Sequence, residues 1–114
     1  MGTCSDVGLV IKKSAYQKYV DWFADNEIDS DNYHVPSDAQ IFEKEDCVLL
    51  VWEDVTNFGL EAPIAKALES IEETDYRLVE ACAEYAADAI SQGELEDDPF
   101  SLEQEVSVVF RYYV

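Results

Sequence analysis

The chain has 114 residues, and its 26 Asp and Glu against seven Lys and Arg give a formal net charge of −19. Its 48% of hydrophobic residues exclude the composition of a disordered chain and suffice for the core of a single domain spanning residues 1–114. So much negative charge repels anionic membranes and nucleic acid, which excludes direct binding to either.

The cysteines and the N-terminus predict a cytoplasmic protein. Cys4, Cys47 and Cys82 are odd in number and widely spaced, with no CxxC pair, which is unlike a secreted disulfide scaffold. The opening MGTCSDVGLVIKKS has no basic leader before an apolar run, so we expect no signal peptide. No apolar stretch approaches the about 18 residues of a membrane span.

The first half of the chain predicts a strand, a helix and a loop. Residues 7–12 are rich in β-formers and predict a strand. Ser14 is the expected N-cap of a helix that Asp25 and Asn26 end. Apolar residues recur on one face of this helix at helical spacing: Tyr16, Tyr19, Val20 and Phe23. The polar, Pro-containing residues 26–38 predict a loop.

Two strands and a second helix follow. Residues 39–44 predict a strand, residues 45–46 a turn, and residues 47–55 (CVLLVWEDV) the strongest strand of the chain. The unbroken apolar stretch from Val48 to Trp52 is typical of an interior strand. Pro63 suits the first turn of a helix. The core stripe expected for that helix consists of Ile64, Ala67, Leu68 and Ile71. Three glutamates should face water: Glu69, Glu72 and Glu73.

The last third of the chain predicts two more strands. Residues 76–82 predict a fourth strand, and residues 83–92 (AEYAADAISQ) a short helix by propensity. Residues 93–99 (GELEDDP) predict an acidic loop, and residues 106–114 (VSVVFRYYV) a final strand. Because successive strand residues point to opposite faces, only one of Tyr112 and Tyr113 should be buried.

The order of elements predicts an α+β fold. A β-α-β-β-α-β sequence is typical of the ferredoxin-like sandwich, here with an acidic excursion and an extra C-terminal strand. Two helices would then cover one face of an antiparallel sheet. The final strand would lie at an edge of the sheet. Pairing of this edge between two copies of the chain would give a homodimer.

Two stretches of the chain hold most of the charge. Residues 21–46 contain nine acids and one base, and residues 80–105 contain nine acids and no base. In an extended segment, alternating carboxylates lie about 6.6 Å apart on one side, where they resemble backbone phosphates. The candidate partner-binding residues are therefore Asp25, Glu27, Asp29, Asp31, Glu94, Glu96, Asp97, Asp98 and Glu103. If the two stretches share a face, they attract a cationic partner.

Solubility, salt adaptation and cation binding are alternative reasons for so acidic a chain. A small domain needs a net charge of only about 2 to 8 for solubility, but a structural or regulatory module whose charge serves only solubility is the main alternative. Adaptation to high salt is a second alternative. A calcium loop is a third, although from Asp29 its fifth and sixth positions are Tyr33 and His34, which breaks the EF-hand pattern.

Catalysis has little support in the sequence. His34 is the only histidine and falls in a polar loop. Cys47 and Cys82 fall in predicted strands, where cysteine is usually a small core residue, and no cysteine has a basic neighbour that would stabilise a thiolate. We therefore expect neither an enzyme nor a cofactor or dedicated metal site.

Four segments resemble a family of small, largely uncharacterised proteins of bacteriophages and prophages. These segments are MGTCSDVGLVIKK, VLLVWEDV, TDYRLVEA and GELEDDPF, and together with their order they span most of the chain. Residues 80–90 depart from the family by being Ala-rich. The family itself implies no known activity for these residues. Small acidic phage proteins often resemble inhibitors of host defence, so a phage setting and the charge of −19 together predict an inhibitor of a host nucleic-acid-binding defence protein, of the anti-CRISPR or anti-restriction type, acting in the host cytoplasm by DNA mimicry. A carboxylate surface would compete for a Lys- and Arg-lined groove that binds phosphates.

Overall fold

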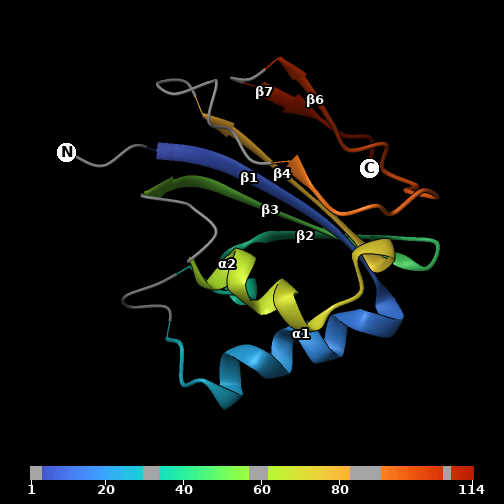
Figure 1. Cartoon of the computed structure of the whole chain (residues 1–114). Helices are drawn as coiled ribbons and strands as arrows, with labels where there is room; N and C mark the ends of the chain where they lie inside the picture. Colours follow the sequence, from blue (N-terminus) through green and yellow to red (C-terminus); the bar gives the residue numbers. More distant parts are fainter. Residues whose placement is uncertain (1–3, 30–33, 57–61, 83–90, 107–108) are drawn as a thin grey trace.

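A five-strand antiparallel sheet forms the centre of this small α+β protein (Figure 1). The computed structural model describes residues 4–29, 34–56, 62–82, 91–106 and 109–114. The strands lie in the order β2-β3-β1-β4-β5, and each neighbouring pair is antiparallel. Their bounds are β1 Cys4–Lys12, β2 Gln40–Lys44, β3 Cys47–Thr56, β4 Tyr76–Cys82 and β5 Ser91–Gln92. The predicted strands at 7–12, 39–44, 47–55 and 76–82 are confirmed.

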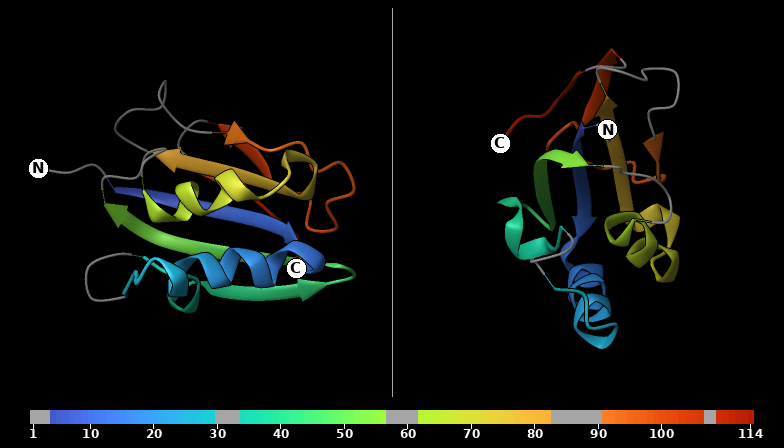
Figure 2. Two further views of the ribbon diagram at one scale, coloured as in Figure 1. Left: turned by 60° about the horizontal axis from the view of Figure 1, so that its bottom comes forward. Right: turned by 90° about the vertical axis from the view of Figure 1, so that its left-hand side faces the viewer.

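Helices cover one face of this sheet (Figure 2). Helix α1 spans Lys13–Asp25, and α2 spans Pro63–Lys66 and continues as the 3-10 helix η2, Ala67–Ser70. Two further 3-10 turns, η1 (Pro36–Asp38) and η3 (Glu73–Asp75), precede β2 and β4. The second predicted helix is therefore shorter than expected, and a separate turn closes it.

Alternation along the strands and helical spacing along the helices place apolar side chains in the core between them. Val7, Leu9 and Ile11 alternate along β1 and all face the helices. The predicted stripe of the second helix is buried in full, and the three glutamates beside it are exposed. The first helix buries Ala15, Tyr19 and Phe23. The Tyr19 hydroxyl donates to the carbonyl oxygen of Ile64 at 2.9 Å, which ties the two helical segments together.

The C-terminal part of the chain covers the other face of the sheet. Leu95, Phe100 and Leu102 are buried there against a second apolar cluster of the sheet, formed by Val10, Cys47, Leu49, Val51 and Val79. A two-strand ribbon of β6 (Glu103–Val106) and β7 (Val109–Arg111) follows (Figure 1). Cover on both faces explains why β3 is apolar from Cys47 to Trp52, since successive side chains of this part are buried on both of its faces.

The predicted N-cap at Ser14 is wrong. The helix begins one residue earlier, and no side chain caps it. Strand β1 runs directly into α1, and the backbone N–H of Lys13 donates to the carbonyl oxygen of Asp46 at 2.8 Å. The turn between β2 and β3 thus supplies an acceptor for one of the first helix N–H groups, which have no partner within the helix.

The predicted helix over 83–92 is wrong at its end. Ser91 and Gln92 form β5, paired with Val79 and Leu78, while residues 83–90 lie outside the described part of the chain. Helix propensity here gives way to strand pairing at the edge of the sheet. Gly93 follows with a φ of 92°, and a Cβ at this position would collide with the carbonyl group of Tyr76. Only glycine therefore fits this turn.

The predicted final strand over 106–114 is also wrong in extent. Val106 ends β6 and β7 stops at Arg111, so the strand ends before the aromatic pair. The backbone N–H of Tyr113 instead donates to the carbonyl oxygen of Phe100 at 2.7 Å, outside any ladder. Tyr112 is partly buried against the second cluster and Tyr113 is 56% exposed, but neither lies in a strand, so the alternation expected for this pair does not set their directions.

Candidate acidic interaction surface

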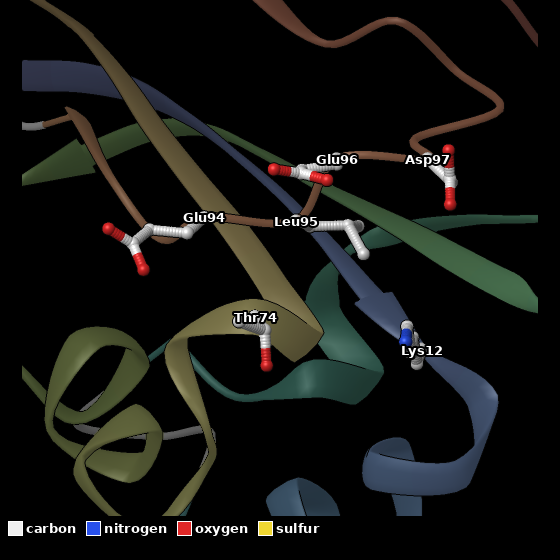
Figure 3. A pocket seen from close by; sticks show the side chains of 6 residues that line it. All are labelled: Lys12, Thr74, Glu94, Leu95, Glu96 and Asp97. Carbon is white, nitrogen blue, oxygen red and sulfur yellow. The ribbon is translucent and has the colours of Figure 1, made fainter.

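A groove of about 560 Å³ opens at the end of the sheet where β1 passes into α1 (Figure 3). One cation, three carboxylates, one hydroxyl and one apolar side chain line it: Lys12, Glu94, Glu96, Asp97, Thr74 and Leu95. We call this hollow the Lys12 groove. The three carboxylates come from the predicted acidic loop, which is confirmed as a segment without regular structure.

Backbone hydrogen bonds hold the acidic loop against this end of the molecule. The N–H of Glu94 donates to the carbonyl oxygen of Glu73 at 2.6 Å, and the N–H of Leu95 donates to that of Tyr76 at 3.2 Å. Leu95 is buried, whereas Glu94 and its neighbour Glu96 are exposed. The loop therefore presents its carboxylates to solvent from a fixed backbone.

Lys12 lies between this loop and further acids on the body of the protein. Its Nζ is 3.6 Å from Oδ1 of Asp75. The turn that carries Asp46 is at the same end, since Cys47 pairs with Lys12 in the sheet. We define the acidic end as Asp46, Asp75, Glu94, Glu96 and Asp97 around Lys12.

The thiol of Cys47 responds to the charges of this end. Burial raises the pKa of Cys47 from 9.0 to about 11, and the carboxylates of Asp46 and then Asp98 add to the rise, while Lys12 opposes it. The side chain is only 1% exposed, so it is a core residue as predicted. Charges from three segments that are distant in sequence, carrying Lys12, Asp46 and Asp98, therefore act on the Cys47 thiol.

The carboxylate of Asp98 accepts hydrogen bonds from the backbone of the residues that follow it. Its two oxygens accept the backbone N–H groups of Phe100, at 2.8 Å, and of Leu102, at 2.7 Å. Ser101 in the same turn has a φ of 52°. The side chain of Asp98 is half-buried, and we assign it to the turn that seats Phe100 and Leu102 on the sheet.

The candidate residues near position 27 lie at the opposite end of α1. Asp25 is the last helical residue, and Glu27 and Asp29 are exposed beyond it. At about 1.5 Å per residue, α1 is about 20 Å long, and its first residue adjoins Lys12. Figure 1 shows the start of the helix and the acidic loop at the same end of the sheet, on its two faces, and the end of the helix at the other side of the molecule.

The expected row of alternating carboxylates does not begin at Glu27. Its φ is 54°, because it occupies the left-handed position that closes the helix. The N–H of Glu27 donates to Ala24 O at 3.2 Å and that of Ile28 to Phe23 O at 3.0 Å. A helix cap, not an extended segment, therefore sets the direction of this side chain.

The structure separates the candidate residues into two groups. Glu94, Glu96 and Asp97 share the acidic end, and Asp25, Glu27 and Asp29 share the far end of α1. Asp31 lies outside the described residues, as does the side chain of Glu103, whose backbone begins β6. Within the described residues, the part of the first acidic stretch near Glu27 is separate from the acidic loop, whereas Asp46, at the other end of that stretch, belongs to the acidic end.

The sequence interpretation missed Lys12, Asp46 and Asp75 as members of the acidic end. The signal for Asp46 was present in the turn predicted at residues 45–46. Beyond this turn, β3 begins beside the strand with which it pairs. That strand is β1, whose end therefore lies next to the turn. The salt bridge of Lys12 to Asp75 depends on tertiary pairing, which spacing along the chain does not predict.

Metal-binding and membrane-spanning sites have no candidate in the described parts of the chain. No group of three or more His, Cys, Asp or Glu side chains there is placed to hold a metal ion. No helix among those residues has both the length and the apolar character to cross a membrane. Comparison with family models, curated proteins and solved structures gives no match.

Proposed function

We propose that the protein binds a cationic surface of a partner protein through the acidic end. The observation that carries this proposal is the convergence of exposed carboxylates from the turn before β3, the turn before β4 and the loop after β5. Lys12 is the only cation that lines the described groove, and it is already paired with Asp75. Lys13 and Lys44 also lie at this end, beside Asp46 and Cys47, but the carboxylates outnumber the lysines, and a mainly negative field attracts a cationic partner and speeds their encounter.

The specific form of this proposal is inhibition of a host defence protein. Grooves that bind nucleic acid present Lys and Arg to the phosphates, and carboxylates would compete with phosphates there. The resemblance of four segments to phage and prophage proteins supports a nuclease or a CRISPR effector complex as the target. The protein would then act by DNA mimicry in the host cytoplasm, as an inhibitor and not as an enzyme.

The fold itself supports a proposal about topology. Strands β1 and β2 are each antiparallel to β3, which lies between them, and β4 is on the other side of β1. We infer that this β2-β3-β1-β4 order is the split β-α-β of a ferredoxin-like sandwich, extended by β5 and by the C-terminal cover.

A solubility module is the second candidate function. The observation that favours it is the presence of exposed acids at both ends of α1. A charge that only keeps the protein soluble would be spread in this way and would show no preference between the two ends.

The direct experiment adds the purified protein to a DNA-cleavage assay with a basic restriction nuclease or a guide-loaded CRISPR effector. We expect inhibition that weakens steeply as salt rises from about 50 to 200 mM, because the contacts are between exposed charges. A protein without the proposed function would leave cleavage unchanged at every salt concentration. Inhibition independent of salt would contradict the electrostatic mechanism.

A further inference from the structure

A second hollow, of about 240 Å³, lies beside the Lys12 groove, between η2 and the start of β4. Its floor is apolar, consisting of Ala65, Leu68, Ile71 and Tyr76, none of which is more than 7% exposed. We call it the η2 groove. It is smaller than the about 300–1,000 Å³ typical of pockets for small molecules, so its size suits a single inserted side chain.

Carboxylates form the rim of the η2 groove. Glu69 and Glu73 are both exposed and both line it. Glu73 lies close enough to the phenol of Tyr76 that its charge, after burial, raises the pKa of that hydroxyl. No Lys or Arg is among the described residues that line this groove. An apolar floor inside an acidic rim is complementary to an apolar side chain with cations on both sides.

The two hollows share a wall. Glu73 lines the η2 groove, Glu94 lines the Lys12 groove, and the backbone N–H of Glu94 donates to the carbonyl oxygen of Glu73 at 2.6 Å. Thr74, which follows Glu73 in the chain, lines the Lys12 groove. Gln92, two residues before Glu94, lines the η2 groove. A short peptide segment can therefore reach both hollows at once.

We propose that the η2 groove binds an apolar side chain of the partner, within a segment whose flanking Lys or Arg residues contact Glu69, Glu73 and the acidic end. This inference rests on the proposed function, because it names the kind of residue that a cationic partner inserts. The apolar side chain supplies specificity that charge alone lacks, since any cation contacts an acidic surface but only a fitting side chain is buried.

Two synthetic peptides separate the contribution of the groove from that of charge: Arg-Arg-Leu-Arg-Arg and Arg-Arg-Ser-Arg-Arg. Titration is followed through the backbone amide NMR signals of the full chain at low salt. We expect the leucine peptide to bind about tenfold more tightly, because it alone removes a leucine side chain from water. The largest shifts should be at Leu68, Glu69 and Tyr76.

A pair of variants tests the location. Ala65→Met places a longer side chain at the groove floor and should abolish the advantage of the leucine peptide while leaving binding of the serine peptide unchanged. Ala24→Met, at an exposed site of α1, is the matched control and should leave the advantage intact. If Ala65→Met fails to fold, Glu69→Gln with Glu73→Gln tests the rim, and both peptides should then bind several-fold more weakly.

The outcomes distinguish the inference from the proposed function. Equal binding of the two peptides by the unaltered protein would overturn the η2 groove and leave the cationic partner in place. Shifts confined to residues 25–29 would overturn both the groove and the acidic end. Failure of both peptides to bind at low salt would overturn the proposed function itself.

Discussion

Cys47 joins the core of the protein to its acidic end. Its side chain packs against Leu95 and Phe100 in the second apolar cluster, while Asp46 and Asp98 add negative charge to its surroundings. Both effects oppose the thiolate, so the pKa is raised. This thiol is therefore a structural residue, and its ionisation is coupled to folding.

The coupling predicts a pH dependence above neutrality. In the unfolded chain the thiol ionises near pH 9.0, and in the folded protein near pH 11. Between these values the unfolded state binds fewer protons, so stability falls as pH rises, and below this range the full stability is present. Replacing Cys47 with Ala removes this contribution. The difference in unfolding free energy between the native protein and Cys47→Ala should narrow across this range, whereas a difference that does not change with pH would contradict the account.

At the scale of elements, residues 93–102 turn a one-sided sheet into a covered one. Gly93 lets the chain turn, Leu95, Phe100 and Leu102 are buried on the sheet, and the Nε–H of Arg77 donates to the carbonyl oxygen of Leu102 at 3.0 Å. The same segment presents Glu94 and its acidic neighbours to solvent. The same segment, residues 93–102, therefore covers this face of the sheet and carries the exposed carboxylates.

Asp98 should be the residue on which this element depends most. Asp98→Ala removes both acceptors of the Phe100 and Leu102 amides and should cost about 1–3 kcal/mol. Asp97→Ala, which removes the same charge one residue earlier from an exposed side chain, should change stability by less than about 0.5 kcal/mol. Urea unfolding of the two variants measures both. Equal losses would show that Asp98 acts through its charge and not through the turn.

The elements predicted best from the sequence were those with long, regular patterns. The bounds 76–82 match β4, and the predicted stripe of Ile64, Ala67, Leu68 and Ile71 is buried although the helix is shorter than predicted. The ends of the chain were predicted less well. Short elements such as β5 depend on pairing with β4 and not on their own propensity, and α1 begins at Lys13, whose N–H donates to the carbonyl oxygen of Asp46, and not after Ser14.

Part of the candidate site could also be predicted. The acidic loop was located correctly, but the assignment of equal roles to its acids overlooked the turn formed by Asp98. Whether the two acidic stretches meet depends on the length and direction of α1, which separates Glu27 from the loop. A count of charges along a sequence does not contain that distance.

At the scale of the whole molecule, the charge of −19 is divided between distinct places. The acidic end gathers carboxylates from three segments around Lys12, and the far end of α1 carries a second group. The proposed function assigns the partner to the first of these, and solubility alone would give the two ends equal roles. This difference between the ends is the central claim.

Two matched triple variants test it most directly. One carries Glu94→Gln, Glu96→Gln and Asp97→Asn, the other carries Asp25→Asn, Glu27→Gln and Asp29→Asn, and each loses three negative charges. Their affinity for the same basic nuclease is measured at a fixed low salt concentration, after unfolding midpoints confirm that both are folded. We predict about tenfold weaker binding for the first variant and little change for the second, because each exposed charge pair contributes a fraction of a kcal/mol. Equal losses in the two variants, or a larger loss at the far end of α1, would contradict the account.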